Sequence, residues 1–135
     1  MTPVLFHLIG GFTVLLGIAH FFLPAIVSLR TVVVDSGTPL RIPGIRYIPS
    51  RRDLHGLVLV MNHAVSYALV TIGFLDITLP SGLDTALGRG VAVWIGVWWL
   101  IRAVAQLHIG RRPFDGFVIV AFGSFAVFHL WAAWA

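Results

Sequence analysis

The chain has 135 residues, of which 59% are hydrophobic and 10% charged, with a net charge of +4. A soluble domain carries about 25% charged residues, and a chain of this length cannot hide so much apolar surface from water. The composition therefore excludes an ordinary soluble globular domain, and the absence of cysteine excludes disulfides, thiolate metal sites and iron–sulfur clusters.

Four apolar runs approach or reach the length of about 20 residues that a membrane-spanning helix needs. Because backbone groups in hydrocarbon must be hydrogen-bonded within their own segment, each run is expected to be an α-helix. Short later connections favour antiparallel neighbours. The sequence predicts an all-α integral membrane protein, in which residues 1–135 form a single antiparallel four-helix bundle. The helices are expected at about residues 4–27, 54–77, 91–109 and 117–135.

The first run, Val4 to Val27, is interrupted only by His7, Thr13 and His20. A cleaved signal peptide begins with positive charge and has a shorter apolar stretch. Residues 1–6 carry no basic side chain, so we expect a retained helix.

The connection at residues 28–53 is the longest polar segment and is rich in arginine. Its prolines exclude a continuous helix, and its mixture of arginine with isoleucine and tyrosine suits the headgroup level of a membrane. Each arginine near anionic lipid contributes about 1 kcal/mol of attraction. We expect a lipid-contacting loop; the alternative is a docking surface for a partner subunit. Its arginines are Arg30, Arg41, Arg46, Arg51 and Arg52.

The distribution of arginine predicts the orientation of the helices. Five arginines in the first connection and two in the third, Arg111 and Arg112, make seven, against Arg89 alone in the second connection. The first and third connections are therefore expected in the cytoplasm, with both chain ends outside. We expect a multi-pass protein of a cell membrane, in a bacterial inner membrane. The arginines lie mostly in short loops rather than on one basic face, so no nucleic-acid partner is expected.

Polar side chains in the runs fall into two layers when depth is estimated from a helical rise of about 1.5 Å per residue. The inner layer lies about 10 to 14 Å from the cytoplasmic ends, and the outer layer about 5 to 9 Å from the outer ends. The inner layer holds His20, Asn62, His63 and Arg102, and the outer layer holds His7 and His129.

Three interpretations of the histidines remain open. The first is plain hydrogen bonding between helices, which averages about 0.6 kcal/mol in membranes. The second is haem b, which needs two neutral imidazoles at matched depth beside small residues. The pairs His20 with His63 and His7 with His129 meet the depth requirement, although His7 and His20 differ by about 140° around their helix. The third is a metal site, built from His20, His63 and either His55 or His108.

Arg102 is the most costly residue in the runs, at about 2.5 to 3.5 kcal/mol for a charge at the membrane centre. It either extends to the cytoplasmic headgroups or faces the bundle beside Asn62 and Gln106. In the second case it would hold a haem propionate, a quinone oxygen or a lipid phosphate.

Phosphate-binding loops and the HExxH and GxSxG motifs are absent. A Ser–His–Asp trio is not expected either, because Asp53, Asp76, Asp84 and Asp115 fall at or beyond the predicted helix ends. The sequence favours a small membrane protein for haem b or quinone-linked electron transfer. The alternative is a non-catalytic accessory subunit of a larger membrane complex, or a lipid-binding module, that docks through the arginine-rich connection.

Overall fold

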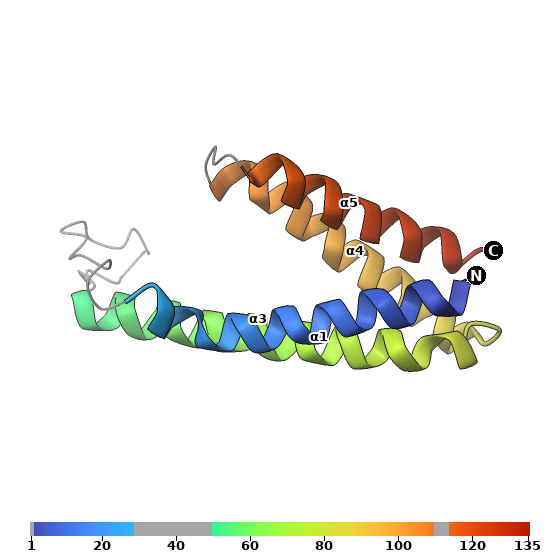
Figure 1. Ribbon diagram of the computed structural model, residues 1–135, viewed down its shortest axis with the longest axis horizontal. Helices are drawn as coiled ribbons and strands as arrows, with labels where there is room; N and C mark the ends of the chain where they lie inside the picture. Colours follow the sequence, from blue (N-terminus) through green and yellow to red (C-terminus); the bar gives the residue numbers. More distant parts are fainter. Residues whose placement is uncertain (1, 29–49, 110–113) are drawn as a thin grey trace, which may run out of the picture. The chain divides into compact units, whose positions relative to one another are not determined.

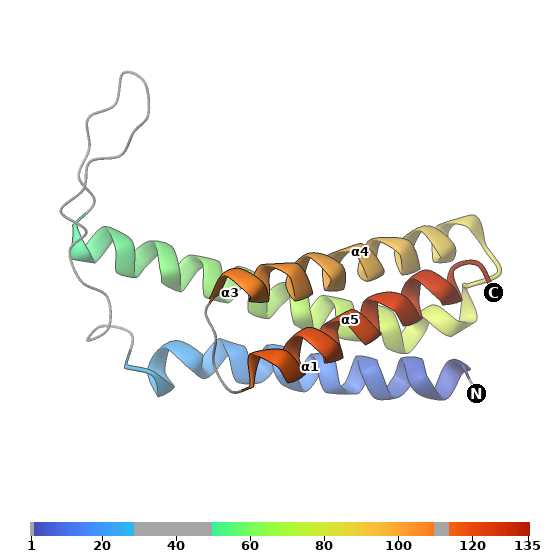
Figure 2. The same ribbon diagram turned by 90° about the horizontal axis from the view of Figure 1, so that it is seen from above.

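The computed structural model describes residues 2–28, 50–109 and 114–135. Most of these residues lie in helices, and they contain no β-strand (Figures 1 and 2). Residues 29–49 and 110–113 lie outside the described residues, and with them most of the predicted arginine-rich connection and both Arg111 and Arg112. The elements are α1 (Thr2–Ile26), α3 (Arg51–Thr78), the short 3-10 helix η1 (Leu79–Ser81), α4 (Ala86–Ile109) and α5 (Asp115–Ala132).

Four of these helices are long and apolar enough to cross a membrane. The prediction of an all-helical chain with four membrane-length helices is therefore confirmed. Many large apolar side chains are exposed, among them Leu15 at 67% and Val127 at 68%. Such a large exposed apolar surface is unfavourable in water but favourable in contact with lipid.

The described chain divides into two compact units. Unit 1 comprises Met1–Gly11 and Ile72–Ala135, and unit 2 comprises Phe12–Thr71. Both α1 and α3 pass from one unit into the other.

Helix α3 begins at Arg51, three residues before the predicted start at residue 54. The cause is a capping box, in which Ser50 and Asp53 satisfy each other's backbone N–H groups. The amide of Ser50 donates to Asp53 Oδ2 at 2.9 Å, and the amide of Asp53 donates to Ser50 Oγ at 3.2 Å. The cap places both Arg51 and Arg52, which are exposed, inside the first turn of the helix.

Helix α4 begins at Ala86, five residues before the predicted start at residue 91. Thr85 provides the cap, because its Oγ1 accepts a 3.0 Å hydrogen bond from the amide of Gly88. Gly88 itself is required here, since a Cβ atom at this position would lie 1.9 Å from the carbonyl oxygen of Gly82.

The core of unit 1 includes an antiparallel hairpin of α4 and α5. Trp99 is fully buried and packs its ring against Phe122 at 4.8 Å and Phe125 at 5.1 Å between centroids. Towards the start of α4, a Cβ on Gly96 would lie 2.8 Å from Leu130 Cγ. Since contacts move backwards along α5 as they move forwards along α4, the two helices are antiparallel.

Candidate functional site

In unit 2, a proline interrupts the backbone hydrogen bonding of α1. Pro24 lies inside the helix and has no backbone N–H, so the carbonyl of His20 loses its usual i+4 donor. Asn62 on α3 replaces it: Asn62 Nδ2 donates to the His20 carbonyl oxygen at 2.8 Å. In hydrocarbon a carbonyl freed by proline must be satisfied by a neighbour. This bond accounts for Asn62 without a ligand.

Close approach of the two helices in unit 2 depends on Gly17. A Cβ atom at this position would lie 2.8 Å from Val70 Cγ2 and 2.9 Å from the Val70 nitrogen. The second of these is a backbone atom, which a rotamer change does not move. Gly17 therefore fixes the spacing of α1 and α3 here.

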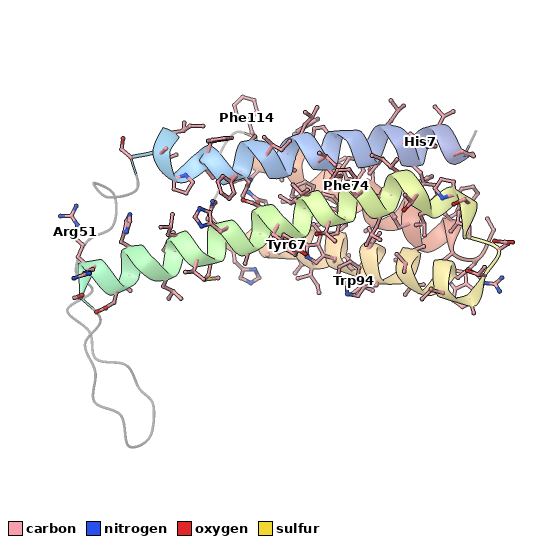
Figure 3. The ribbon with its side chains drawn as sticks, turned by 90° about the horizontal axis from the view of Figure 1, so that it is seen from below. His7, Arg51, Tyr67, Phe74, Trp94 and Phe114 are labelled. Atoms are coloured by element: carbon pink, nitrogen blue, oxygen red, sulfur yellow. The ribbon has the colours of Figure 1, made fainter. Side chains whose placement is uncertain are left out.

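Beside this contact lies an apolar groove between α1 and α3, with a volume of about 340 Å³. It begins at Gly17 and runs towards His63; Tyr67, on α3, is labelled in Figure 3. It is lined by Gly17, Ile18, Phe21 and Phe22 of α1 and by His63, Ser66, Tyr67 and Val70 of α3.

The polar atoms of this groove come from α3. The His63 ring stacks on Phe21, with centroids 4.7 Å apart and 21° between the planes. The hydroxyl of Ser66 already donates to the carbonyl oxygen of Asn62 at 2.8 Å. Among residues 2–28, 50–109 and 114–135, neither the His63 ring nitrogens nor the Tyr67 hydroxyl has a hydrogen-bond partner. The surface of the groove is thus almost wholly apolar, with an imidazole and a phenol among the side chains that line it.

Unit 1 holds a second polar cluster, between α3 and α5. His129 Nε2 lies 2.9 Å from Asp76 Oδ1, and both side chains are fully buried. The other ring nitrogen, Nδ1, lies 2.7 Å from the Phe125 carbonyl oxygen. Phe6 of α1 packs edge-on against the His129 ring at 5.4 Å. Asp76 Oδ2 is buried and lacks a hydrogen-bond partner among the described residues.

The partners of His129 define where its protons lie. A carbonyl oxygen only accepts, so Nδ1 carries a proton and donates it to Phe125. The 2.9 Å contact between Nε2 and Asp76 Oδ1 then needs one further proton, held either by the carboxyl or by the ring. In both cases the pair as a whole is neutral, which suits its burial.

The outer pair of the haem hypothesis, His7 and His129, occupies two different environments. His7 is exposed, and its Nδ1 lies 2.6 Å from the carbonyl oxygen of Pro3 on its own helix. His129 is fully buried, with both ring nitrogens hydrogen-bonded. An iron atom at His129 would have to displace Asp76 or Phe125.

The inner-layer residues, together with the other predicted ligands near the cytoplasmic ends, are distributed between the units. His20, Asn62, His63 and the half-buried His55 belong to unit 2, whereas Arg102, Gln106 and His108 belong to unit 1.

Gln106 and Arg102 have separate surroundings on α4. Gln106 Nε2 donates to Asp115 Oδ1 at 2.8 Å and joins α4 to α5. Arg102 is half-buried. His108 is exposed, with Nδ1 3.3 Å from the Val104 carbonyl oxygen. No group of three or more potential metal ligands is found among the described residues. The metal site of His20, His63 and His55 or His108 stays a prediction.

Sequence reasoning set Asp76 aside because of its place near a helix end. It is nevertheless the single acidic residue within the four apolar runs, and an ionisable residue at membrane depth is a functional candidate by default. That signal, combined with a histidine on another run, was sufficient to single out Asp76.

Comparison of the chain with protein-family models, with curated proteins and with solved structures gives no match.

Proposed function

We propose that this chain is a multi-pass membrane protein that binds the ring of a lipid-soluble quinone in the groove beside His63. The observation that carries the proposal is an apolar groove lined by His63 and Tyr67, whose imidazole and hydroxyl have no hydrogen-bond partner among the described residues.

Quinone chemistry matches this lining. A quinone carbonyl accepts hydrogen bonds, and both an imidazole N–H and a phenol O–H donate them. The flat ring packs against aromatic side chains such as Phe21 and Phe22, and the isoprenoid tail remains in lipid. A groove of about 340 Å³ lies at the lower end of the range of roughly 300 to 1,000 Å³ for small-molecule sites, which suits a single ring.

A lipid acyl chain is the competing occupant of the groove. It would fill the apolar part but leave His63 and Tyr67 without partners, and an unpaired polar group in hydrocarbon is costly. The polar atoms therefore favour a ring with oxygen substituents over an acyl chain.

The proposed role is quinone-linked electron transfer. Reduction of a quinone to a quinol consumes two electrons and two protons, and the electrons would come from a redox partner in a larger membrane complex. This chain's contribution is to bind and orient the ring. His63 would donate to the carbonyl of the quinone and accept from the hydroxyl of the quinol.

The membrane arrangement is part of the same proposal. The four helices would form one antiparallel bundle in a bacterial inner membrane, with both chain ends outside. The arginine-rich connection would lie against anionic headgroups in the cytoplasm, starting from the exposed Arg51 and Arg52 at the first turn of α3.

Equilibrium binding of decylubiquinone to the purified protein in lipid nanodiscs tests the proposal. His63→Phe preserves stacking on Phe21 but removes the ring nitrogens, and Tyr67→Phe removes only the hydroxyl. Loss of one hydrogen bond of about 0.5 to 1.5 kcal/mol weakens binding by about 2- to 10-fold. His55→Phe, on the same helix but outside the groove, is the matched control and should bind like the parent. Equal binding by all four proteins would leave an acyl chain as the occupant.

Haem b remains a second proposal, with His20 and His63 as the inner ligand pair. It predicts a Soret band in the absorption spectrum of the parent protein expressed with haem supplied. Loss of the band in both His20→Ala and His63→Ala, with His7→Ala unaffected, would support one inner site. A colourless parent rejects haem and leaves the quinone proposal standing.

The accessory-subunit alternative places the function in the arginine-rich connection, most of which lies outside the described residues. It predicts that replacing Arg30, Arg41 and Arg46 by glutamine releases the protein from its complex while decylubiquinone binding is unchanged.

A further inference from the structure

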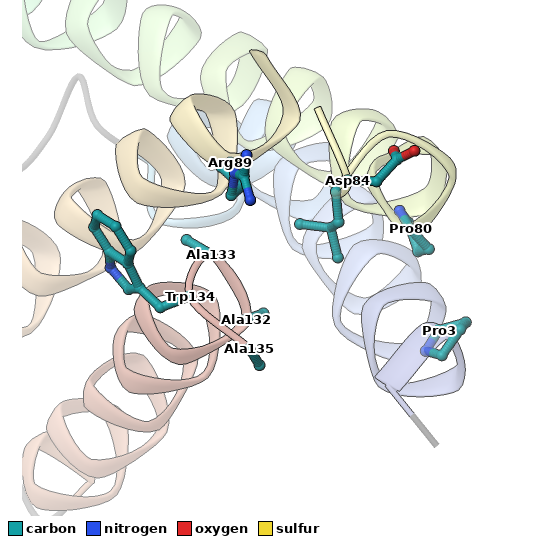
Figure 4. Close-up of a pocket in the computed structure, with 9 residues that line it drawn as sticks. Pro3, Pro80, Asp84, Arg89, Ala132, Ala133, Trp134 and Ala135 are labelled. Atoms are coloured by element: carbon teal, nitrogen blue, oxygen red, sulfur yellow. The ribbon is translucent and has the colours of Figure 1, made fainter. Parts of the chain in front are cut away.

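A pocket of about 490 Å³ lies in unit 1 at the ends of the helices (Figure 4). Pro80 and Asp84 line it from the segment that links α3 to α4, Arg89 from α4, and Ala132 and Ala133 from the end of α5. Asp84 and Arg89 are both exposed, so the pocket has charged groups at its wall and is suited to hold water.

This pocket lies about one helical turn from the buried pair of Asp76 and His129. Pro80 follows Asp76 by four positions, and Ala133 follows His129 by four positions. At a rise of about 1.5 Å per residue, each step corresponds to about 6 Å along the helix axis. The ends of α3 and α5 therefore lead from the pair to the pocket, with Pro80 in η1 and Ala133 one residue beyond α5.

The pair is incomplete in one respect. Asp76 Oδ2 is buried and has no hydrogen-bond partner among the described residues, although buried polar atoms are almost always satisfied. An acceptor in this state attracts a proton, or a water molecule that delivers one. Gly10 of α1 approaches closely, since a Cβ there would lie 3.0 Å from Asp76 Cβ.

We propose that Asp76 and His129 form a reversible proton-binding site inside unit 1, supplied with protons from water in the adjoining pocket. The site is independent of the groove at His63 and does not require a quinone.

In the neutral state, one proton is shared between Asp76 Oδ1 and His129 Nε2. Uptake transfers a proton from a hydronium ion in the pocket to Oδ2, leaves water behind and gives the pair one positive charge. Release transfers the shared proton to water, leaves one negative charge, and turns the lone pairs of Oδ1 and Nε2 towards each other.

Few other charges act on this site. Asp76 contacts α1 through Gly10 and α5 through His129, and Phe6 covers the ring of His129. Among the described residues, His129 is the one ionisable side chain bonded to Asp76. Asp84 and Arg89 are the charged residues that line the pocket.

Infrared difference spectra of the protein in nanodiscs, taken between mildly acidic and mildly alkaline pH, test the site. We expect a carboxylic acid band that changes with pH and is lost in Asp76→Asn. Asp115→Asn is the matched control: Asp115 is also buried, but its carboxylate accepts from Gln106, so the band should survive there.

A second measurement uses the parent protein, in case Asp76→Asn fails to fold. In nitrogen NMR of the protein labelled at histidine, with the His129 signals assigned by His129→Gln, Nε2 should shift over the same pH range as the carboxylic acid band. Infrared and NMR signals that stay constant over the whole range would overturn the proposal, because the pair would then hold its proton permanently and serve only to join α3 to α5.

Discussion

Asn62 donates a 2.8 Å hydrogen bond to the carbonyl oxygen of His20, the acceptor that Pro24 leaves without a donor inside α1. Pro24, His20 and Asn62 therefore act together: the proline removes a donor from α1, and Asn62 of α3 supplies another. His20 takes part through its backbone carbonyl. The side chain of Asn62 supplies the hydrogen bond that this carbonyl does not receive from position 24 of its own helix.

If Asn62 compensates for Pro24, substitutions at these two positions should have coupled effects on stability. Asn62→Leu should destabilise the protein by about 0.6 kcal/mol, the average for a hydrogen bond between membrane helices, and by at most about 1.7 kcal/mol. In a Pro24→Ala background the helix supplies its own donor to His20, so the same substitution should cost little. Reversible unfolding in mixed detergent micelles measures all four proteins as a double-mutant cycle. Equal costs in both backgrounds would show that Asn62 does not serve the proline break.

The glycines of α1 provide a second prediction. Gly17→Ala should destabilise the protein by about 1 to 3 kcal/mol, because its Cβ would meet the Val70 backbone nitrogen at 2.9 Å. Gly11→Ala is the matched control on the same helix: nothing lies within 4 Å of its Cβ, and alanine is the better helix former by about 1 kcal/mol. Midpoints of thermal unfolding in detergent should therefore fall for Gly17→Ala and stay level or rise for Gly11→Ala. The same result for both variants would contradict the close packing of α1 on α3.

The orientation in the membrane has its own test, because the chain contains no cysteine. Single cysteines at Ser36 and Ser81 report on the first and second connections. With both chain ends outside, an impermeant thiol reagent applied to intact cells should label Ser81→Cys but not Ser36→Cys. Labelling in the opposite pattern would reverse the orientation and place the arginine-rich connection outside.

The helices were predictable from sequence because hydrocarbon leaves the backbone no alternative to internal hydrogen bonds. The ends of the helices were less predictable, because they depend on the capping hydrogen bonds of individual side chains. Ser50 with Asp53 extends α3, and Thr85 extends α4, although each segment is too polar to count as part of an apolar run.

The sequence indicates which polar residues lie at similar depth, but it does not indicate which of them contact each other. Depth along each helix predicted one layer of His20, Asn62, His63 and Arg102, and within it the structure joins Asn62 to the His20 carbonyl. Depth alone does not give the rotation of a helix about its axis, and rotation decides that His129 meets Asp76 and that the His63 ring stacks on Phe21. Gln106 was expected beside a ligand, yet it bonds to Asp115, a partner supplied by the fold of α5 against α4.

The most direct test of the proposed function observes His63 itself. Nitrogen NMR of the protein labelled at histidine, in nanodiscs, records the ring nitrogens of all six histidines before and after decylubiquinone is added, with His63→Phe assigning the signal. The quinone proposal predicts a saturable shift of the His63 ring nitrogens and no change at His55, because His63 lines the groove and His55 does not. A spectrum in which the His63 signals stay in place at saturating decylubiquinone would contradict the proposal.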